Sequence, residues 1–207
     1  MTFFELVVAR WSKIAVLTQE HIFLVFISVL VAMCLGIAIG IAITYYQPAA
    51  RVILAFCQIL MTVPSLAMVG LLLPLFGIGF KTGVAALILY SLLPIVRNTY
   101  TGIQEISPPI LEAAKGMGMK ELTILRRIKL PVAFPVIMAG IRTAVVMIVG
   151  IAAIASYIGA GGLGEFIFRG ISQWNKQLVL LGAICISVLA IVFDLLFKYL
   201  EHHLREI

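Results

Sequence analysis

The chain reads Glu-Ala-Ala-Lys-Gly-Met-Gly over residues 112–118 and, after nine further residues, Ile-Lys-Leu-Pro over residues 128–131. Both motifs lie in the most charged part of a very apolar protein, between two hydrophobic stretches. Ser107 can cap the start of a helix, and Pro108 and Pro109 suit its first turn. The glycines of the first motif then break or turn that helix. A charged, helix-forming insert of this kind predicts a docking element for a soluble partner.

Composition places most of the chain in a membrane. Hydrophobic residues make up 63% of the 207 residues, and the mean hydropathy is +1.17, well above the values of soluble domains. The net charge of +6 does not indicate nucleic acid, because the basic residues cluster in loops between apolar runs. We expect one transmembrane domain over residues 1–207. We expect its three cysteines to be packed thiols, and we expect no metal site.

Five stretches are long and apolar enough to cross a bilayer, which requires roughly 20 helical residues. Pro64 and Pro74 are expected to bend the second of them. Residues 1–20 carry apolar side chains at helical spacing and predict an amphipathic interfacial helix, although a frayed polar terminus stays open. The fold class is therefore all-α, a polytopic membrane protein preceded by an amphipathic helix. The spans are Ile22–Thr44, Val52–Phe76, Ile78–Val96, Val132–Ile158 and Leu178–Leu200.

The 35 residues from 97 to 131 are too long for an ordinary connection. We predict a second helix within them, Met119–Lys129, with Pro131 at its junction with the next span. With this loop in the cytoplasm, nine Lys and Arg residues lie on the cytoplasmic side and five on the other. The positive-inside rule then favours an external N-terminus and a cytoplasmic C-terminus.

The two motifs with their fixed gaps resemble the EAA loop of permease subunits in ATP-binding-cassette (ABC) importers. In that family the loop seats in a cleft of the cytoplasmic ATPase. The resemblance implies the type I ABC importer fold, similar to methionine permeases, and assigns residues 97–131 as the coupling loop. The residues that it assigns to ATPase coupling are Glu112, Ala113, Ala114, Lys115, Gly116, Gly118, Ile128, Leu130 and Pro131.

Residues 62–66, 92–102 and 158–164 resemble one permease subfamily, which imports the osmoprotectants glycine betaine, carnitine and choline. The last segment also resembles methionine and phosphonate permeases, so those solutes remain alternatives. The resemblance implies a bacterial inner-membrane location, two copies of an ATPase, and a second permease, identical or related. Because about seven residues follow the last span, we expect the extracellular or periplasmic binding protein to be a separate chain. This chain itself would hold no cofactor, with ATP and Mg bound by the ATPase.

Two segments are candidates for solute contact. Pro64 removes a backbone hydrogen bond within a span, which is tolerated where the backbone is packed in protein or lines a cavity. The side chains near it either line the pathway or satisfy the carbonyls of a kink. Residues 159–164, the Gly-rich turn, suit a tight re-entrant turn on the external side, or a flexible loop. The pathway candidates are Thr62, Pro64, Ser65, Tyr90, Ser91 and Asn98, and the candidate glycines of the turn are Gly159, Gly161, Gly162 and Gly164.

No catalytic set is visible, and no glycine loop followed by Lys-Ser/Thr would bind the phosphates of ATP. A membrane-embedded enzyme would need clustered His, Asp or Glu, and a channel or secondary carrier would not need a long partner loop. We therefore interpret the chain as a non-catalytic transport subunit. Because five spans are few to enclose a transport path, we expect it to work as a permease dimer, with the substrate crossing between the subunits.

Single residues within the spans support two further predictions. Arg142 and Asp194 should be neighbours in the same leaflet, because an unpaired charge in the bilayer costs roughly 3 kcal/mol. The alternative is that Arg142 snorkels alone or points into the pathway. Gly36 and Gly40 form a small-residue face that we expect to pack helices.

Overall fold

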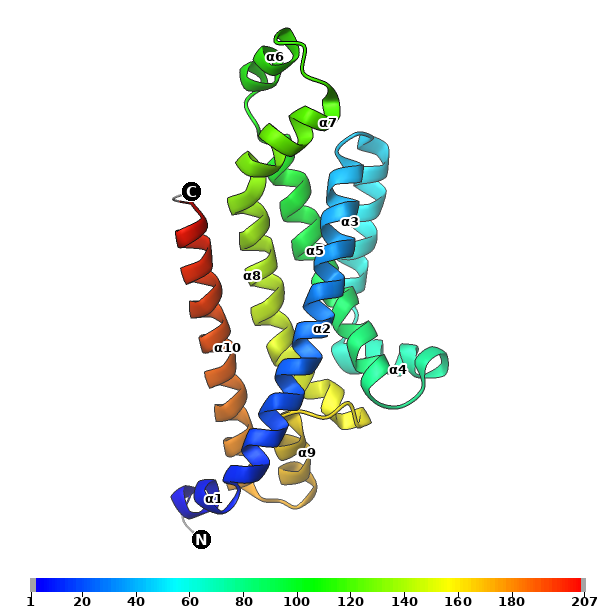
Figure 1. Ribbon diagram of the computed structural model, residues 1–207. Helices are drawn as coiled ribbons and strands as arrows, with labels where there is room; N and C mark the ends of the chain where they lie inside the picture. Colours follow the sequence, from blue (N-terminus) through cyan, green and yellow to red (C-terminus); the bar gives the residue numbers. More distant parts are fainter. Residues whose placement is uncertain (1–2, 206–207) are drawn as a thin grey trace.

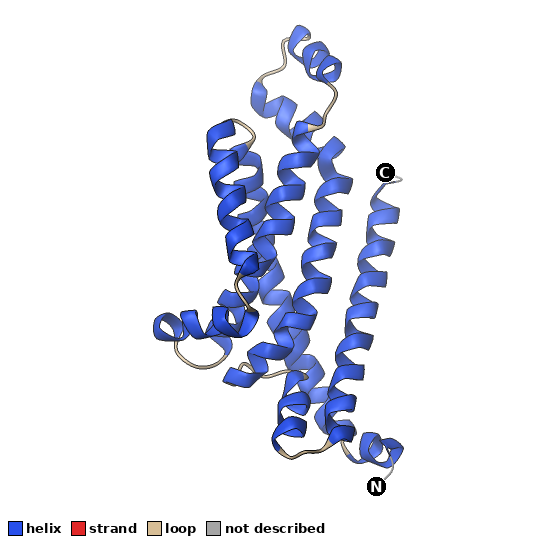
Figure 2. Ribbon diagram, turned by 180° about the vertical axis from the view of Figure 1, so that it is seen from behind, coloured by secondary structure: helices blue, strands red, loops and turns tan. Residues whose placement is uncertain are grey.

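A computed structural model describes residues 3–205, and in that range the chain folds into helices joined by short connections (Figure 1). No strand occurs among these described residues (Figure 2), which confirms the all-α class. Residues 1, 2, 206 and 207 of the predicted domain lie outside the described residues. The elements are α1 Phe3–Ala9, α2 Trp11–Ile43, α3 Gln47–Thr62, α4 Ser65–Phe76, α5 Phe80–Gln104, α6 Pro108–Gly116, α7 Glu121–Ile124, the π-helix η1 Leu125–Lys129, α8 Leu130–Ala155, the 3-10 helix η2 Ser156–Ile158, α9 Gly164–Ser172 and α10 Lys176–Arg205.

The long helices match the predicted membrane spans in number and place. In the described part of the chain, four helical segments are long and apolar enough to cross a membrane, and they contain α2, α5, α8 and α10. The bent pair of α3 and α4 makes a fifth if it counts as one span. The prediction of about five spans is therefore confirmed.

The second predicted span, Val52–Phe76, is broken by a sharp bend. The axes of α3 and α4 differ by 105°, and α4 points sideways out of the bundle in Figure 1. Pro64 has no N–H and forces Val63 into an extended conformation, so α3 cannot continue through it. Pro74 lies inside α4, which continues to Phe76.

The N-terminal helix is shorter than predicted, because the first span begins earlier. The expected interfacial helix over residues 1–20 reduces to α1, and α2 already begins at Trp11. The charged residues in the first part of α2 have partners. Lys13 Nζ lies 2.7 Å from Glu165 Oε1, and the Glu20 carboxylate accepts a hydrogen bond from the Gly-rich turn. A compensated charge is compatible with a helix that continues into an apolar run.

The predicted 97–131 loop is also shorter in the structure. The helix α5 continues to Gln104, so the first part of the expected loop extends the preceding span. The second expected helix begins at Glu121 and runs without a large bend to Ile158. Only residues 105–120, which carry α6, leave the bundle. We call this segment the α6 protrusion.

Pro131 lies where η1 gives way to α8, as the sequence predicted, but the helix does not break at this junction. The turn before it is widened into a π-helix, in which the Leu130 N–H bonds to the Leu125 carbonyl five residues back. Such widened turns shift the hydrogen-bond register of a helix. Pro131 follows directly and, with no N–H to donate, enters α8 in its first turn, where proline is tolerated. Residues 121–129 and the fourth span therefore form one continuous helical rod.

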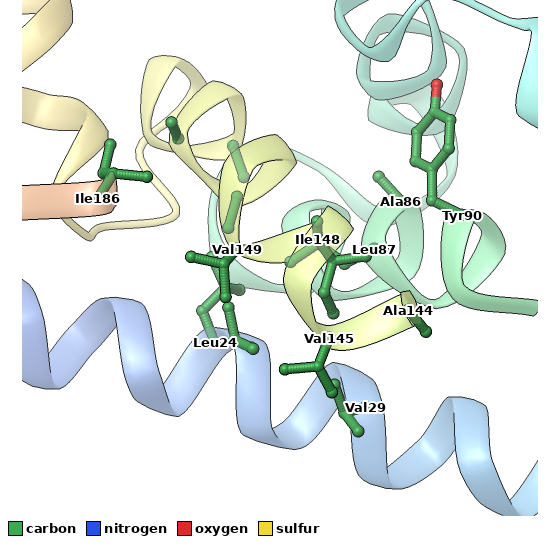
Figure 3. Close-up of a cluster of buried hydrophobic side chains, with 14 of the residues drawn as sticks. Leu24, Val29, Ala86, Leu87, Tyr90, Ala144, Val145, Ile148, Val149 and Ile186 are labelled. Atoms are coloured by element: carbon green, nitrogen blue, oxygen red, sulfur yellow. The ribbon is translucent and has the colours of Figure 1, made fainter. Parts of the chain in front are cut away.

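The core lies where α5 packs between α2 and α8, which are its most extensive neighbours. Figure 3 shows apolar side chains from these helices meeting, including Leu24, Leu87 and Ile148. All three are completely buried.

Two glycines let α2 approach α5 closely. A Cβ on Gly36 would lie 2.7 Å from Ile95 Cγ2, and one on Gly40 would lie 2.5 Å from Thr99 Cβ. The prediction that these glycines pack helices is confirmed. Because the face is used within the chain, it does not supply a contact for a second permease.

Candidate functional site

The start of α6 is determined mainly by backbone geometry. Pro108 and Pro109 occupy its first turn, as the sequence predicts. Ser107 stands at the N-cap position, but its side chain makes no capping hydrogen bond. Its carbonyl instead accepts a bond from the Ile110 N–H at 3.1 Å. The expected side-chain cap is therefore absent, and the prolines set the helical direction.

The end of α6 forms a Schellman cap, in which backbone N–H groups turn back to the last carbonyls. The Met119 N–H bonds to the Ala114 carbonyl at 3.2 Å, and the Gly118 N–H bonds to the Lys115 carbonyl at 2.9 Å. Gly118 has φ +74°, the left-handed conformation that this cap requires. The turn predicted from the spacing of the glycines therefore depends on Gly118. Gly116 is an ordinary helical residue at the end of α6.

The two motifs occupy different levels of the protein. Glu112 to Gly118 lie on and after α6, which stands at the far end of the molecule (Figure 1). Ile128 lies in the widened turn, and Leu130 and Pro131 begin α8 at the root of the protrusion. Sequence spacing therefore places one motif at the tip and the other at the base.

The surface of the protrusion is more apolar than an ordinary solvated loop. Met117 is 72% exposed and Ile110 is exposed as well, as is Leu122 just beyond the segment in α7. Ala114 is completely buried, so one side of α6 packs inward while the other is free. At the base, Lys129 Nζ pairs with Glu121 Oε1 at 2.5 Å. An exposed apolar surface on a locally braced segment is suited to contact with another protein.

The bend at Pro64 is held by a side chain from α5. The Tyr90 hydroxyl donates to the Val63 carbonyl at 2.5 Å, which replaces the helical partner that the bend removes. On α3, the Thr62 hydroxyl donates to the Ile59 carbonyl at 2.7 Å. Tyr90 thus links α5 to the joint between α3 and α4.

The other pathway candidates differ in accessibility. Ser91 is completely buried, and its hydroxyl donates to the Leu87 carbonyl one turn earlier in α5. Asn98 is half-buried and donates to the Pro94 carbonyl at 2.8 Å. Ser65 at the start of α4 is also half-buried.

The Gly-rich turn is tight and is held against α2. Gly159, Gly161 and Gly162 all have positive φ. Gly164 begins α9 so close to α8 that a Cβ would lie 2.1 Å from the Ala153 carbonyl oxygen. These values agree with the predicted tight turn and differ from those of a flexible loop.

Two residues that sequence reasoning did not select hold this turn. Glu20 Oε2 accepts a hydrogen bond from the Gly162 N–H at 3.0 Å, and His21 Nδ1 accepts one from the Leu163 N–H at 3.2 Å. The other ring nitrogen of His21 lies 3.0 Å from the Val149 carbonyl of α8. Since one nitrogen faces a donor and the other an acceptor, the imidazole is neutral with its proton on Nε2. In the sequence, the sign of this role was the Glu20-His21 pair directly before a long apolar run.

A charged pair joins α8 to α10 within the spans. Arg142 Nε donates to Asp194 Oδ1 at 2.7 Å, and Nη2 donates to Oδ2 at 2.9 Å. This bidentate geometry is the strong form of an arginine–carboxylate contact. Glu201 lies 3.8 Å from the same guanidinium, and the pair lines an open groove of about 470 Å³. The predicted neighbourhood of Arg142 and Asp194 is confirmed, while the participation of Glu201 was missed.

Comparison with known proteins supports one family. Residues 13–206 match the family described as "Binding-protein-dependent transport system inner membrane component". The chain is 44% identical to the osmoprotectant import permease protein OsmW of Salmonella typhimurium over 193 residues, which cover 91% of this chain and 90% of the relative. It is 40% identical to the glycine betaine/carnitine/choline transport system permease protein OpuCB of Bacillus subtilis over 177 residues, which cover 86% and 82%.

Solved structures show the same fold at lower identity. A chain of the inward-facing MetNI methionine ABC transporter matches with a TM-score of 0.82 and 19% identity, covering 90% of this chain and 93% of that one. A chain of an amino acid ABC transporter with histidines matches with a TM-score of 0.79 and 21% identity, covering 98% and 99%. These matches bear on the fold alone.

Proposed function

This chain belongs to the family of binding-protein-dependent transport system inner membrane components, and we propose that it is the permease subunit of an ABC importer for quaternary ammonium osmoprotectants. The relatives at 40–44% identity carry osmoprotectant or glycine betaine, carnitine and choline in their names. The observation that carries the proposal is the α6 protrusion, whose sequence motif, left-handed glycine cap and exposed apolar tip occur together. Methionine or a phosphonate is the alternative solute.

The α6 protrusion docks the ATPase. Its exposed surface carries Met117 and Ile110, and Leu122 is exposed just beyond it in α7. Contact with a protein cleft would remove these side chains from water. Methionine suits such a contact because its flexible side chain adapts as the partner moves. The exposed Arg126 and Arg127 at the base add positive charge beside the contact. Motion of the ATPase would reach the spans through the continuous rod that leads into α8.

The orientation follows from this docking. With the α6 protrusion in the cytoplasm, α1 and the Gly-rich turn face outward and the end of α10 faces inward. The course of the helices in Figure 1 is compatible with this arrangement, because α1 and α9 lie at the end opposite α6. The excess of Lys and Arg on the α6 side supports the same direction.

The working assembly contains two copies of the ATPase, a second permease and a separate extracellular or periplasmic binding protein. ATP and Mg are bound by the ATPase, and this chain supplies no cofactor site. Substrate crosses between the two permeases. The Pro64 bend is proposed to line this path, with Thr62, Ser65 and Tyr90 near it and Ser91 and Asn98 supporting α5.

Uptake by cells tests the solute and the mechanism together. In a strain without other osmoprotectant uptake, the chain with its neighbouring ATPase and binding protein should restore uptake of choline, glycine betaine or carnitine. Methionine uptake with none of these would refute the solute class. Uptake that persists with a hydrolysis-deficient ATPase would indicate a channel or secondary carrier.

Docking is tested separately by copurification. Replacing Met117 with Ser should reduce recovery of the ATPase with the permease while the permease remains in the membrane. Replacing the equally exposed Leu71 of α4 with Ser is the matched control, because this side chain lies outside the α6 protrusion. Equal loss of ATPase in both variants would contradict docking at α6.

A further inference from the structure

Trp174 occupies a backbone position that favours glycine. Its φ is +54°, and it is the sole non-glycine residue with positive φ in the described range 3–205. It follows α9 in a Schellman cap. The Asn175 N–H bonds to the Gly170 carbonyl at 2.8 Å, and the Trp174 N–H bonds to the Ile171 carbonyl at 3.2 Å. The end of α6 has the same hydrogen-bond pattern, but there the left-handed residue is Gly118.

The Trp174 side chain is not packed within the chain that holds it. It is 94% exposed, so burial in this chain does not offset the unfavourable backbone conformation. Residues in such a strained backbone conformation are found mainly where the side chain makes a functional contact. What contacts the indole must therefore lie outside this chain.

The position of Trp174 relative to α10 indicates what that contact is. The tryptophan lies two residues before α10, which is the least buried of the four apolar segments that can cross a membrane. An exposed apolar stripe runs along α10 from Leu180 to Leu195 and is followed by the exposed Tyr199. From Lys176 to Tyr199 a helix rises about 35 Å, which fits the roughly 30 Å hydrocarbon core and the start of the headgroup layers.

The same arrangement is repeated at the start of α2. Trp11 is the first residue of α2, is also exposed, and has Lys13 two residues later, just as Lys176 follows Trp174. The start of α2 and the connection between α9 and α10 lie at the same end of the molecule (Figure 1). The Lys13–Glu165 ion pair ties the beginning of α2 to α9. Tryptophan is enriched at the boundary between lipid headgroups and acyl chains.

We propose that Trp174 is a membrane-interface anchor, with its indole at the lipid headgroup boundary, where it sets the depth of α10 in the bilayer. The partner is the lipid surface itself. The left-handed backbone is retained because it directs the indole outward from the end of α9. The inference does not depend on which solute the protein transports.

The chain contains two tryptophans, so replacing Trp11 with Phe leaves Trp174 as a single fluorophore. The full-length variant is reconstituted in bilayers of phosphatidylcholine brominated either near the headgroup or near the bilayer centre. Quenching by the shallow bromine should exceed quenching by the deep bromine by about twofold or more, as an interfacial indole requires. The variant with Trp174 replaced by Phe reports Trp11 as the comparison, and Trp11→Tyr is used if Trp11→Phe does not fold.

Three outcomes would overturn the proposal. Stronger quenching by the deep bromine would place the indole in the hydrocarbon core. Quenching by aqueous iodide, with the emission of a water-exposed indole and no effect of either lipid, would leave Trp174 free for a soluble protein. Blue-shifted emission that neither lipid nor iodide quenches would show that a second copy of the chain covers it.

Discussion

In the Gly-rich turn, a Cβ on Gly164 would lie 2.1 Å from the backbone oxygen of Ala153, whereas a Cβ on Gly118 of the α6 protrusion would meet nothing within 4 Å. The turn is bonded to α2 through Glu20 and His21. The cap at the end of α6 uses backbone bonds within its own segment. Both regions contain glycines with a left-handed backbone, but only in the Gly-rich turn does a glycine also allow close contact between helices.

This difference indicates that the two ends of the protein differ in rigidity. Interhelical hydrogen bonds and backbone contacts make the Gly-rich turn part of the core, so it can move only with α2, α8 and α9 together. The α6 protrusion maintains its shape locally and leaves apolar side chains uncovered. It can therefore form and lose contacts with a partner without unfolding, which the proposed coupling role requires.

Replacing Gly164 with Ala should have the largest effect. The new Cβ would overlap backbone atoms of α8, so α9 would have to move, and we expect a loss of about 3 kcal/mol or more in folding free energy. Thermal unfolding in detergent measures it. Gly150→Ala on α8 is the control, because a Cβ there meets nothing within 4 Å and the residue has no positive φ. Equal midpoints for both variants would show that the Gly-rich turn is not tightly packed.

Replacing His21 with Ala should cost somewhat less. It removes the acceptor for the buried Leu163 N–H and the donor to Val149, and it leaves a cavity, so we expect a loss of about 2–3 kcal/mol. Glu20→Gln keeps an oxygen acceptor for the Gly162 N–H and should change stability by less than about 1 kcal/mol. The same thermal assay compares them. If His21→Ala were as stable as Glu20→Gln, the comparison between the two ends would lose its main support.

The Arg142–Asp194 pair lies away from both ends, so its effect on stability serves as a reference for the changes made at the two ends. Each single change to Ala should lower the unfolding midpoint, since it breaks the bidentate contact, although Glu201 still lies 3.8 Å from the guanidinium when Asp194 is replaced. The double change should be less damaging than the sum of the singles, because the second change removes a group that has already lost its partner. Unfolding midpoints of the four proteins in the cycle measure this coupling. Strict additivity would mean that the bidentate contact has no energetic role.

Replacing Gly118 with Ala should have only a small effect on stability but a clear effect on transport. A Cβ at φ +74° costs about 1 kcal/mol, and it disturbs the cap that positions Met117. Gly116→Ala is the matched control, because its surroundings are equally open and its backbone is helical. We expect solute uptake and solute-stimulated ATP hydrolysis to fall in the Gly118 variant only. Wild-type values in both variants would remove the distinction drawn between the two glycines.

Several features were predictable because they depend on composition and spacing. Apolar length indicated about five spans, and the gap between two short motifs indicated a protruding helix with a glycine turn. The neighbourhood of Arg142 and Asp194 followed from helical rise and from the cost of an isolated charge in lipid. Each of these is a local or additive property, so a single sequence contains it.

Other helix boundaries differ from expectation because they depend on hydrogen bonds and ion pairs that the sequence pattern does not show. Lys13 and Glu20 lie within the interfacial helix expected over residues 1–20, but α2 runs through both, and their partners are Glu165 and the Gly-rich turn. Pro131 looked like a helix boundary, but the widened turn before it lets the helix continue.

By itself, the sequence determined the all-α membrane class, the family motifs and the positions where glycine or proline alters the backbone. Only the tertiary structure decided that His21 bridges α8 and the Gly-rich turn, that α4 turns 105° away from α3, and that Trp174 is left exposed. Hydropathy and local propensity sum over neighbours in the chain. Hydrogen bonds and exposure depend on which distant segments meet, and packing alone establishes that.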